Sequence, residues 1–100
     1  MMRVTILPGA ERDLEAIGDY IAQDDPLRAA AFVQELRQAT DVLATFPEAF
    51  PCVPGYEPED IRSHTRGRYV IYYRVFRTEN RVTVLRVLHG AQDRRHHLNP

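Results

Sequence analysis

The sequence has no lysine and only one cysteine, and both scarcities limit what the protein can be. All 13 basic residues are arginine, whose planar guanidinium suits carboxylate and phosphate partners better than an ammonium group does. The single cysteine, Cys52, cannot form an internal disulfide or a cysteine metal cluster, so an ordinary loop thiol is expected.

No apolar run approaches the roughly 18 residues of a membrane helix. The N-terminal stretch MMRVTILPGAERD lacks the apolar segment of a signal peptide. A cytoplasmic protein with no membrane partner is therefore expected.

Charge is distributed unevenly along the chain. With 100 residues, 44% of them hydrophobic and 27% charged, the composition is typical of one globular domain over residues 1–100. Residues 1–60 hold 4 Arg and 12 Asp or Glu, a balance of −8. Residues 61–100 hold 9 Arg and 2 Asp or Glu, a balance of +7, together with all four histidines. This segregation predicts that the two halves face different partners.

Two helices are predicted between residues 10 and 46. The first has an apolar stripe with helical spacing, formed by Ala10, Leu14, Ile17 and Ile21. Asp25 is placed to cap the second, which begins at Pro26 and ends before Pro47. Its stripe consists of Phe32, Leu36, Ala39, Leu43 and Phe46. The short connection between the helices predicts an antiparallel hairpin.

The rest of the chain predicts strands and one long loop. A short strand precedes Pro8, and further strands are expected over 61–65, 68–77 and 81–89. Residues 47–60 contain four prolines and form a loop that is either functional or a passive crossing over the surface. The order β-α-α-β-β-β indicates an α+β fold in which a helical hairpin packs on a small antiparallel sheet.

The last two strands predict a hairpin with two distinct faces. A three-residue turn over 78–80, with Asn80 in the left-handed conformation, pairs Arg77 with Arg81. Alternation then places one apolar set under the helices: Tyr69, Ile71, Tyr73, Val75, Thr83, Leu85, Val87 and His89. The opposite face carries Val70, Tyr72, Arg74, Phe76, Val82, Val84, Arg86 and Leu88, with Arg86 opposite Tyr72.

That second face is the strongest candidate for a binding surface. Both helices are already used on the first face, so no part of the chain is expected to cover the second. An exposed apolar patch with embedded arginines is typical of an interface. The alternative is a moderately apolar face exposed to solvent, which antiparallel sheets tolerate.

Three groups of polar residues were considered as chemical sites. Glu11, Glu15 and Asp19 share one face of the first helix, which a solvated surface explains. His96 and His97 are adjacent in sequence and point apart, a poor arrangement for ligands, so neither a metal nor another cofactor is expected. Ribonuclease chemistry needs an acid, a base and positive charge near the phosphate, which could be supplied by Arg62, His64, Arg68, His89, Arg94 and His96. A basic strip that holds an acidic segment or a nucleic acid backbone explains the same residues.

The chain also resembles the ParE branch of the RelE/ParE toxin superfamily, the plasmid stabilisation proteins. The resemblance covers nearly the whole chain, through ERDLEAIGDYIAQDDPLRAAAFVQEL, LATFPE, GRYVIYYRV and VTVLRVLHGAQDRR. Its most specific parts are the YxxYYRV strand and the VLRVLHGxxD ending. It implies the same β-α-α-β-β-β fold and the toxin role of a type II toxin–antitoxin system.

The resemblance also implies partners. A ParD-like antitoxin would wrap the toxin in a hetero-oligomer and would be the only component that binds operator DNA. ParE members inhibit DNA gyrase, so a protein inhibitor rather than an enzyme is expected. RelE-type relatives instead cut mRNA on the ribosome. They place an arginine where this chain has Val70, although Arg62 and His64 could imitate their other basic residues. A degenerate member without toxicity is a further alternative.

On this interpretation the binding residues fall into two groups. The apolar–arginine face is assigned to the antitoxin, through Tyr72, Arg74, Phe76, Val82, Val84 and Arg86. The tail after Gly90 is assigned to the target, through Arg94, Arg95 and His96. No catalytic residue is expected unless the protein is a ribonuclease, in which case Arg62, His64 and His96 are the candidates.

Overall fold

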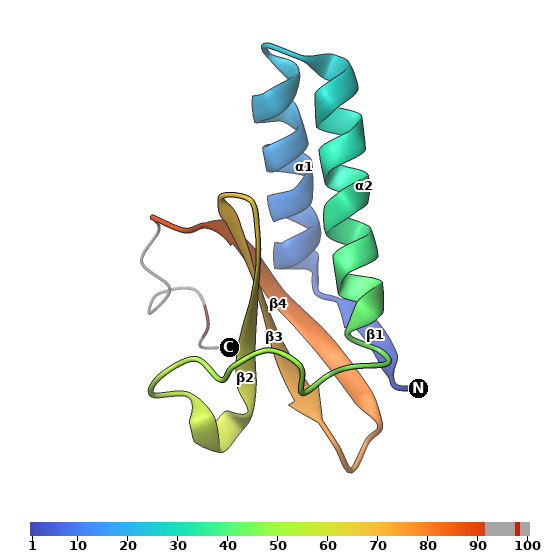
Figure 1. The fold of residues 1–100 in the computed structure, drawn as a ribbon, viewed down its shortest axis with the longest axis vertical. Coiled ribbons are helices and arrows are strands. Elements are labelled where there is room, and N and C mark those ends of the chain that lie inside the picture. The colour runs from blue at the N-terminus through green and yellow to red at the C-terminus, as the bar shows by residue number, and fades with distance from the viewer. Residues whose placement is uncertain (92–97, 99–100) are drawn as a thin grey trace.

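A helical hairpin and a four-stranded sheet form the two layers of the protein (Figure 1). The computed structural model describes residues 1–91 and Leu98. Its elements are β1 (Arg3–Ile6), α1 (Pro8–Ala22), α2 (Pro26–Val42), the 3-10 helix η1 (Glu57–Glu59), β2 (Ile61–Arg66), β3 (Tyr69–Phe76) and β4 (Arg81–His89). This order confirms the predicted α+β fold. Within the described residues, neither helix combines the length and apolar character that crossing a bilayer requires.

The helices begin and end close to the predicted residues. Pro8 occupies the first turn of α1, a position that suits its fixed φ, so the helix starts two residues before the predicted Ala10. The Asp25 side chain accepts a hydrogen bond from the Arg28 N–H at 3.0 Å, which confirms the predicted cap. The end of α2 was predicted too late. Its last turn tightens into a bond from the Leu43 N–H to the Thr40 carbonyl, and Phe46 beyond it is 59% exposed.

The sheet is mixed, with strand order β1-β4-β3-β2. The strands β2, β3 and β4 are antiparallel, as predicted, but β1 pairs parallel with β4. A tight turn makes neighbouring strands antiparallel, whereas β1 is connected through helices and is free of that constraint. The prediction of a wholly antiparallel sheet was therefore wrong for this one strand.

The main core lies between the sheet and the helical hairpin. Its buried members come from every layer: Ala10, Leu14, Ile17, Phe32, Leu36, Ala39, Leu43, Ile71, Tyr73, Val75, Val82, Val84 and Val87. The Tyr73 hydroxyl donates a hydrogen bond to the Pro47 carbonyl at 2.8 Å, so the one polar atom of this large buried side chain is satisfied. Burial raises the pKa of Tyr73 to about 12, which keeps this hydroxyl protonated as a donor.

The β3–β4 hairpin has a different register from the predicted one along half of its length. Phe76, not Arg77, pairs with Arg81, so the turn spans four residues, with Asn80 left-handed at φ 52° as predicted. Further along, the pairing shifts between Tyr72 and Tyr73, where β4 carries Leu85 as an extra residue. The bulge restores the predicted pairing of Tyr72 with Arg86.

These two changes exchange the faces of the first half of β4. Because side chains alternate, a shift of one residue moves each of them to the other side of the sheet. Val82 and Val84 therefore lie in the core under the helices, where both are 0% exposed. The prediction that they lie on the open face was wrong. Thr83 and Leu85 line the open face in their place.

The face away from the helices is partly covered, also contrary to prediction. A second cluster there consists of Val53, Ile61, Tyr72, Leu88 and Leu98. The long loop returns along β2, and the Val53 N–H donates a hydrogen bond to the Ile61 carbonyl at 2.8 Å. Composition alone did not predict this packing, because it identifies a proline-rich loop but not the part of the protein that the loop contacts.

Candidate functional site

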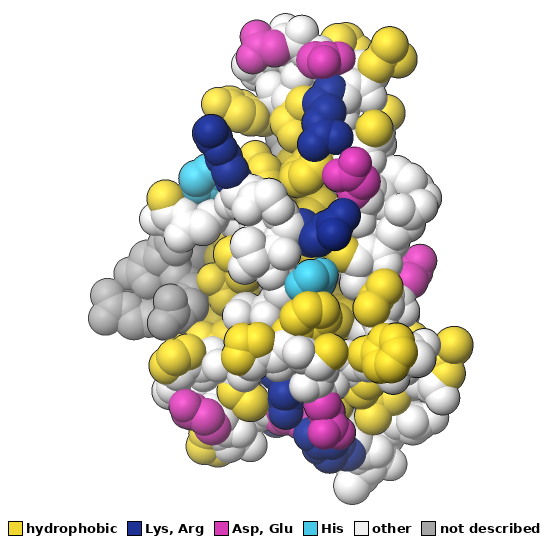
Figure 2. All heavy atoms as spheres, in the orientation of Figure 1, with side chains coloured by type: hydrophobic (Ala, Val, Ile, Leu, Met, Phe, Trp, Pro, Cys, Tyr) yellow, Lys and Arg dark blue, Asp and Glu magenta, His cyan; other side chains and the backbone are white. Residues whose placement is uncertain are grey.

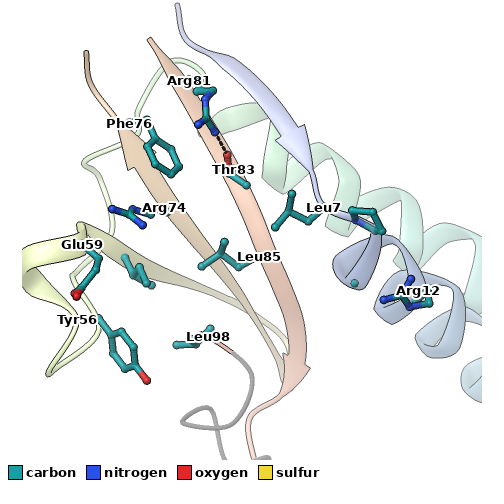
Figure 3. Close-up of a pocket in the computed structure, with 13 residues that line it drawn as sticks. Leu7, Arg12, Tyr56, Glu59, Arg74, Phe76, Arg81, Thr83, Leu85 and Leu98 are labelled. Carbon is teal, nitrogen blue, oxygen red and sulfur yellow. Dashed lines mark hydrogen bonds between the residues drawn. The ribbon is translucent and has the colours of Figure 1, made fainter. Parts of the chain in front are cut away.

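A groove of about 780 Å³ remains open on the sheet face opposite the main core (Figure 3). Its floor consists of side chains from β3 and β4, and the start of α1 forms one wall. The loop before β2 and the side chain of Leu98 close the other end. Its lining residues are Leu7, Pro8, Gly9, Arg12, Tyr56, Glu59, Ile61, Arg74, Phe76, Arg81, Thr83, Leu85 and Leu98.

Two arginines flank one aromatic ring in this groove. The Phe76 ring lies between the guanidinium carbon of Arg81, 3.9 Å from its centroid, and that of Arg74, 4.6 Å away (Figure 3). Arg81 also donates a hydrogen bond to the Thr83 hydroxyl at 2.6 Å. Because Phe76 and Arg81 are directly paired across the strands, the register itself produces this contact.

Arg74 lacks the polar partner that its burial requires. Its Nε atom is buried and has no hydrogen-bond partner among the described residues. Glu59 lines the same groove, yet no ion pair joins it to Arg74 within the described chain. A buried donor without a partner costs about 1–3 kcal/mol, more when it is charged. The Nε atom of Arg74 therefore points to a ligand group that the described residues do not supply.

Arg86 forms a contact within the protein, whereas the prediction left its side chain available on the open face of the sheet. Its Nε and one terminal nitrogen donate to the two carboxylate oxygens of Asp13, at 2.7 and 2.8 Å. The hydrogen bond to Asp13 raises the pKa of Arg86. The same carboxylate accepts the Val87 N–H at 2.9 Å, beyond the point where β1 stops pairing with β4. Asp13 thus joins α1 to the end of β4 that pairs with β3 but lies beyond β1.

Tyr72 also lies deeper than predicted. It is 7% exposed and packs in the second cluster with Val53, Leu88 and Leu98. Of the six residues assigned to a partner, Arg74 and Phe76 alone line the groove. Val82 and Val84 lie in the main core and offer nothing to a partner unless the core opens.

Of the ribonuclease candidates Arg62, His64 and His96, the structure describes the first two. Arg62 donates to Asp60 at 2.8 Å and to the Phe50 carbonyl at 2.9 Å, so its guanidinium holds the loop before β2. The His64 ring stacks on Phe50, with centroids 3.8 Å apart. Burial, followed by the charge of Arg66, lowers the pKa of His64 below its usual 6.5. His96, and the target residues Arg94 and Arg95, lie outside the described residues.

The family model for the ParE toxin of the type II toxin–antitoxin system parDE matches residues 4–94. The chain belongs to the ParE toxin family. Its fold resembles a chromosomal ParDE toxin–antitoxin system from P. aeruginosa, with a TM-score of 0.73, 25% identity and coverage of 89% of this chain and 96% of that one. It also resembles the toxin–antitoxin complex RelBE2 from Mycobacterium tuberculosis, with a TM-score of 0.60, 27% identity and coverage of 88% and 96%. No curated protein sequence matches significantly.

Membership of the ParE family confirms what the sequence resemblance implied about identity and fold. The groove residues are less predictable from the sequence, because the predicted alternation puts Thr83 and Leu85 under the helices and Leu7 falls in the predicted first strand. The stretch Arg77–Asn80 is also compatible with a four-residue hairpin loop, the next most common class after shorter turns. No local signal announces the bulge at Leu85.

Proposed function

We propose that this ParE-family chain is the toxin of a toxin–antitoxin pair, that it inhibits DNA gyrase, and that a ParD-like antitoxin neutralises it. The family match over residues 4–94 carries the proposal. The similarity to a ParDE system from P. aeruginosa supports a ParD-like partner rather than one of another kind. The proposed site of action is the cytoplasm, and operator DNA is contacted only through the antitoxin.

The antitoxin is proposed to occupy the groove on the sheet. Arg74 supplies a guanidinium whose Nε atom has no partner within the described chain, and Phe76 and Leu85 supply apolar surface beside it. A partner segment that carries a carboxylate between apolar side chains would satisfy both features at once. The proposed antitoxin-binding residues are therefore Arg74, Phe76, Arg81 and Leu85.

The tail is proposed to contact the target. Arg94, Arg95 and His96 follow the last strand in a segment rich in positive charge. The expected result of replacing both arginines with alanine is weaker toxicity in cells with unchanged antitoxin affinity. Full toxicity of that double variant would remove the tail from the target interface.

A gyrase assay with antitoxin-free protein tests the proposed target. Supercoiling and the accumulation of cleaved DNA should be scored in the same reaction. Loss of supercoiling together with trapped DNA breaks is the expected result, and the addition of antitoxin should reverse both. Unaffected gyrase would overturn the target assignment. Cleavage of mRNA on ribosomes by the same preparation would then indicate the RelE-type activity.

Replacement of one groove residue tests the antitoxin site. Phe76→Glu should raise the dissociation constant for the antitoxin at least about tenfold, since it removes the ring that two arginines contact and places a charge on the apolar floor. Phe46→Glu is the matched control, because Phe46 is 59% exposed and does not line the groove. Equal affinities of the two variants would place the antitoxin elsewhere.

A further inference from the structure

A second surface shares no lining residue with the groove. It carries two arginines that form no ion pair among the described residues. It lies where the β2–β3 turn approaches the helical hairpin. Arg66 and Arg68 flank Gly67 in this turn, and both are exposed. Among the described residues, neither side chain takes part in a hydrogen bond or an ion pair. Figure 2 shows arginine and histidine side chains on this side of the molecule, with acidic side chains lying among them.

Glycine permits this turn to approach the helices closely. Gly67 has φ +60°, a conformation that other residues rarely adopt. A side chain at this position would start 3.6 Å from the Phe32 ring of α2. The turn therefore lies in contact range of the Phe32 ring of α2, with an arginine on each side of Gly67.

Two shallow hollows adjoin Arg68, whereas Arg66 lines neither of them. They have volumes of about 330 and 340 Å³, and Tyr20, Arg68 and Tyr69 line both of them. The first also includes His89, whose ring packs edge-on against Tyr69 with centroids 5.5 Å apart. The second includes Arg28, which lies 5.0 Å from the Phe32 centroid. Neither hollow is lined by a carboxylate.

Exposed aromatic surface accompanies the charge. Tyr20 is 68% exposed near the end of α1. Arg66 and Arg68 have no ion-pair partner among the described residues, whereas Arg28 in the second hollow pairs with Glu35 at 3.3 Å. The two unpaired arginines and the nearby exposed tyrosine match the requirements of single-stranded nucleic acid. Its phosphates need guanidinium groups, and its unpaired bases stack on rings.

We infer that the β2–β3 turn and the adjoining end of α1 form a binding surface for single-stranded nucleic acid, in which Arg66 and Arg68 contact phosphates and Tyr20 stacks on a base. An acidic protein segment would use the arginines as well, but it would gain little from the exposed ring. The surface uses neither the groove proposed for the antitoxin nor the tail proposed for gyrase. It therefore does not depend on either proposal.

Binding of a labelled 20-nucleotide strand to the antitoxin-free chain, measured by fluorescence anisotropy, tests this inference. DNA and RNA strands of the same sequence distinguish the two sources of the ligand. The double variant Arg66→Ala/Arg68→Ala should weaken binding by at least about tenfold and lower the slope of log K against log salt by about 1.4, at about 0.7 for each phosphate contact. The control Arg3→Ala/Arg77→Ala removes the same charge from two other exposed arginines and should keep most of the affinity.

The ring is tested separately. Tyr20→Ala should weaken binding several-fold without changing the salt slope, because base stacking is not electrostatic. Equal losses in the two double variants would show that net charge alone attracts the strand and would overturn the inference. Unchanged affinity of Tyr20→Ala, or tighter binding of a polyglutamate peptide than of either strand, would overturn it in favour of an acidic partner.

Discussion

The two faces of the sheet differ in how completely the rest of the chain covers them. On the helix side, the core is closed, and Leu14, Leu36 and Tyr73 are 0% exposed. On the other side, the loop and Leu98 cover only one end, and the groove leaves Arg74 with a buried Nε atom that lacks a partner within the described chain. The same strands thus provide stability on one face and an incomplete surface on the other. The incomplete face is the one expected to gain from a partner.

The largest expected effect tests whether stability resides on the helix side. Leu36→Ala should lower the free energy of unfolding by about 2–5 kcal/mol, because it opens a cavity in the closed core. Urea denaturation followed by circular dichroism measures it.

Leu85→Ala is the matched control on the groove side. Leu85 is only partly buried, so its truncation should cost clearly less than that of Leu36. Similar losses in the two variants would show that the groove face contributes to stability as strongly as the core does.

The next effect concerns the connection between α1 and β4. Asp13→Ala should lower the free energy of unfolding by about 1–3 kcal/mol, because the variant removes the carboxylate that accepts from the partly buried Arg86 guanidinium and from the Val87 N–H. Glu11→Ala, which breaks the half-exposed pair with Arg37, should cost only about 0.2–1 kcal/mol by the same denaturation measurement. If Asp13→Ala is no worse than Glu11→Ala, the connection adds nothing to stability.

A substitution of Arg74 can separate an effect on folding stability from an effect on antitoxin binding. Arg74→Met keeps the aliphatic stem and removes the unpaired donor, so the free protein should unfold with an unchanged or slightly higher free energy. The dissociation constant for the antitoxin should nevertheless rise about tenfold, which corresponds to about 1.4 kcal/mol. Isothermal titration calorimetry measures the affinity. A variant that binds normally would contradict the role of Arg74, whatever its stability.

The smallest effect is a dependence on pH. The pKa of His64 is lower in the folded protein than its usual 6.5, so the unfolded chain binds more protons below that value. Stability should therefore be highest above about pH 6.5 and should fall as the pH drops through the lowered pKa. His64→Gln should flatten this part of the profile, measured as thermal midpoints between pH 5 and 7. An identical slope in both proteins would exclude His64 as its source.

Much of the fold followed from local patterns in the sequence. Apolar residues at helical spacing identified both helices, and Asp25 before Pro26 identified the start of the second one, because capping and periodicity depend on neighbours within a few residues. The run YVIYYRVF and the following RVTVLRVLH identified the hairpin for the same reason. The resemblance carried by these segments was sufficient to indicate the ParE family.

The binding site depended instead on details that span distant parts of the chain. One extra turn residue and the bulge at Leu85 exchanged the faces of Val82 through Leu85, since a strand has a period of two and a shift of one residue reverses it. Arg86 was placed opposite Tyr72 from the sequence, yet only the folded chain brought Asp13 within 2.7 Å of it. The sequence by itself determined the helices, the strands and the family. The tertiary structure decided which side chains remain available to a partner, because availability depends on what the rest of the chain has already covered.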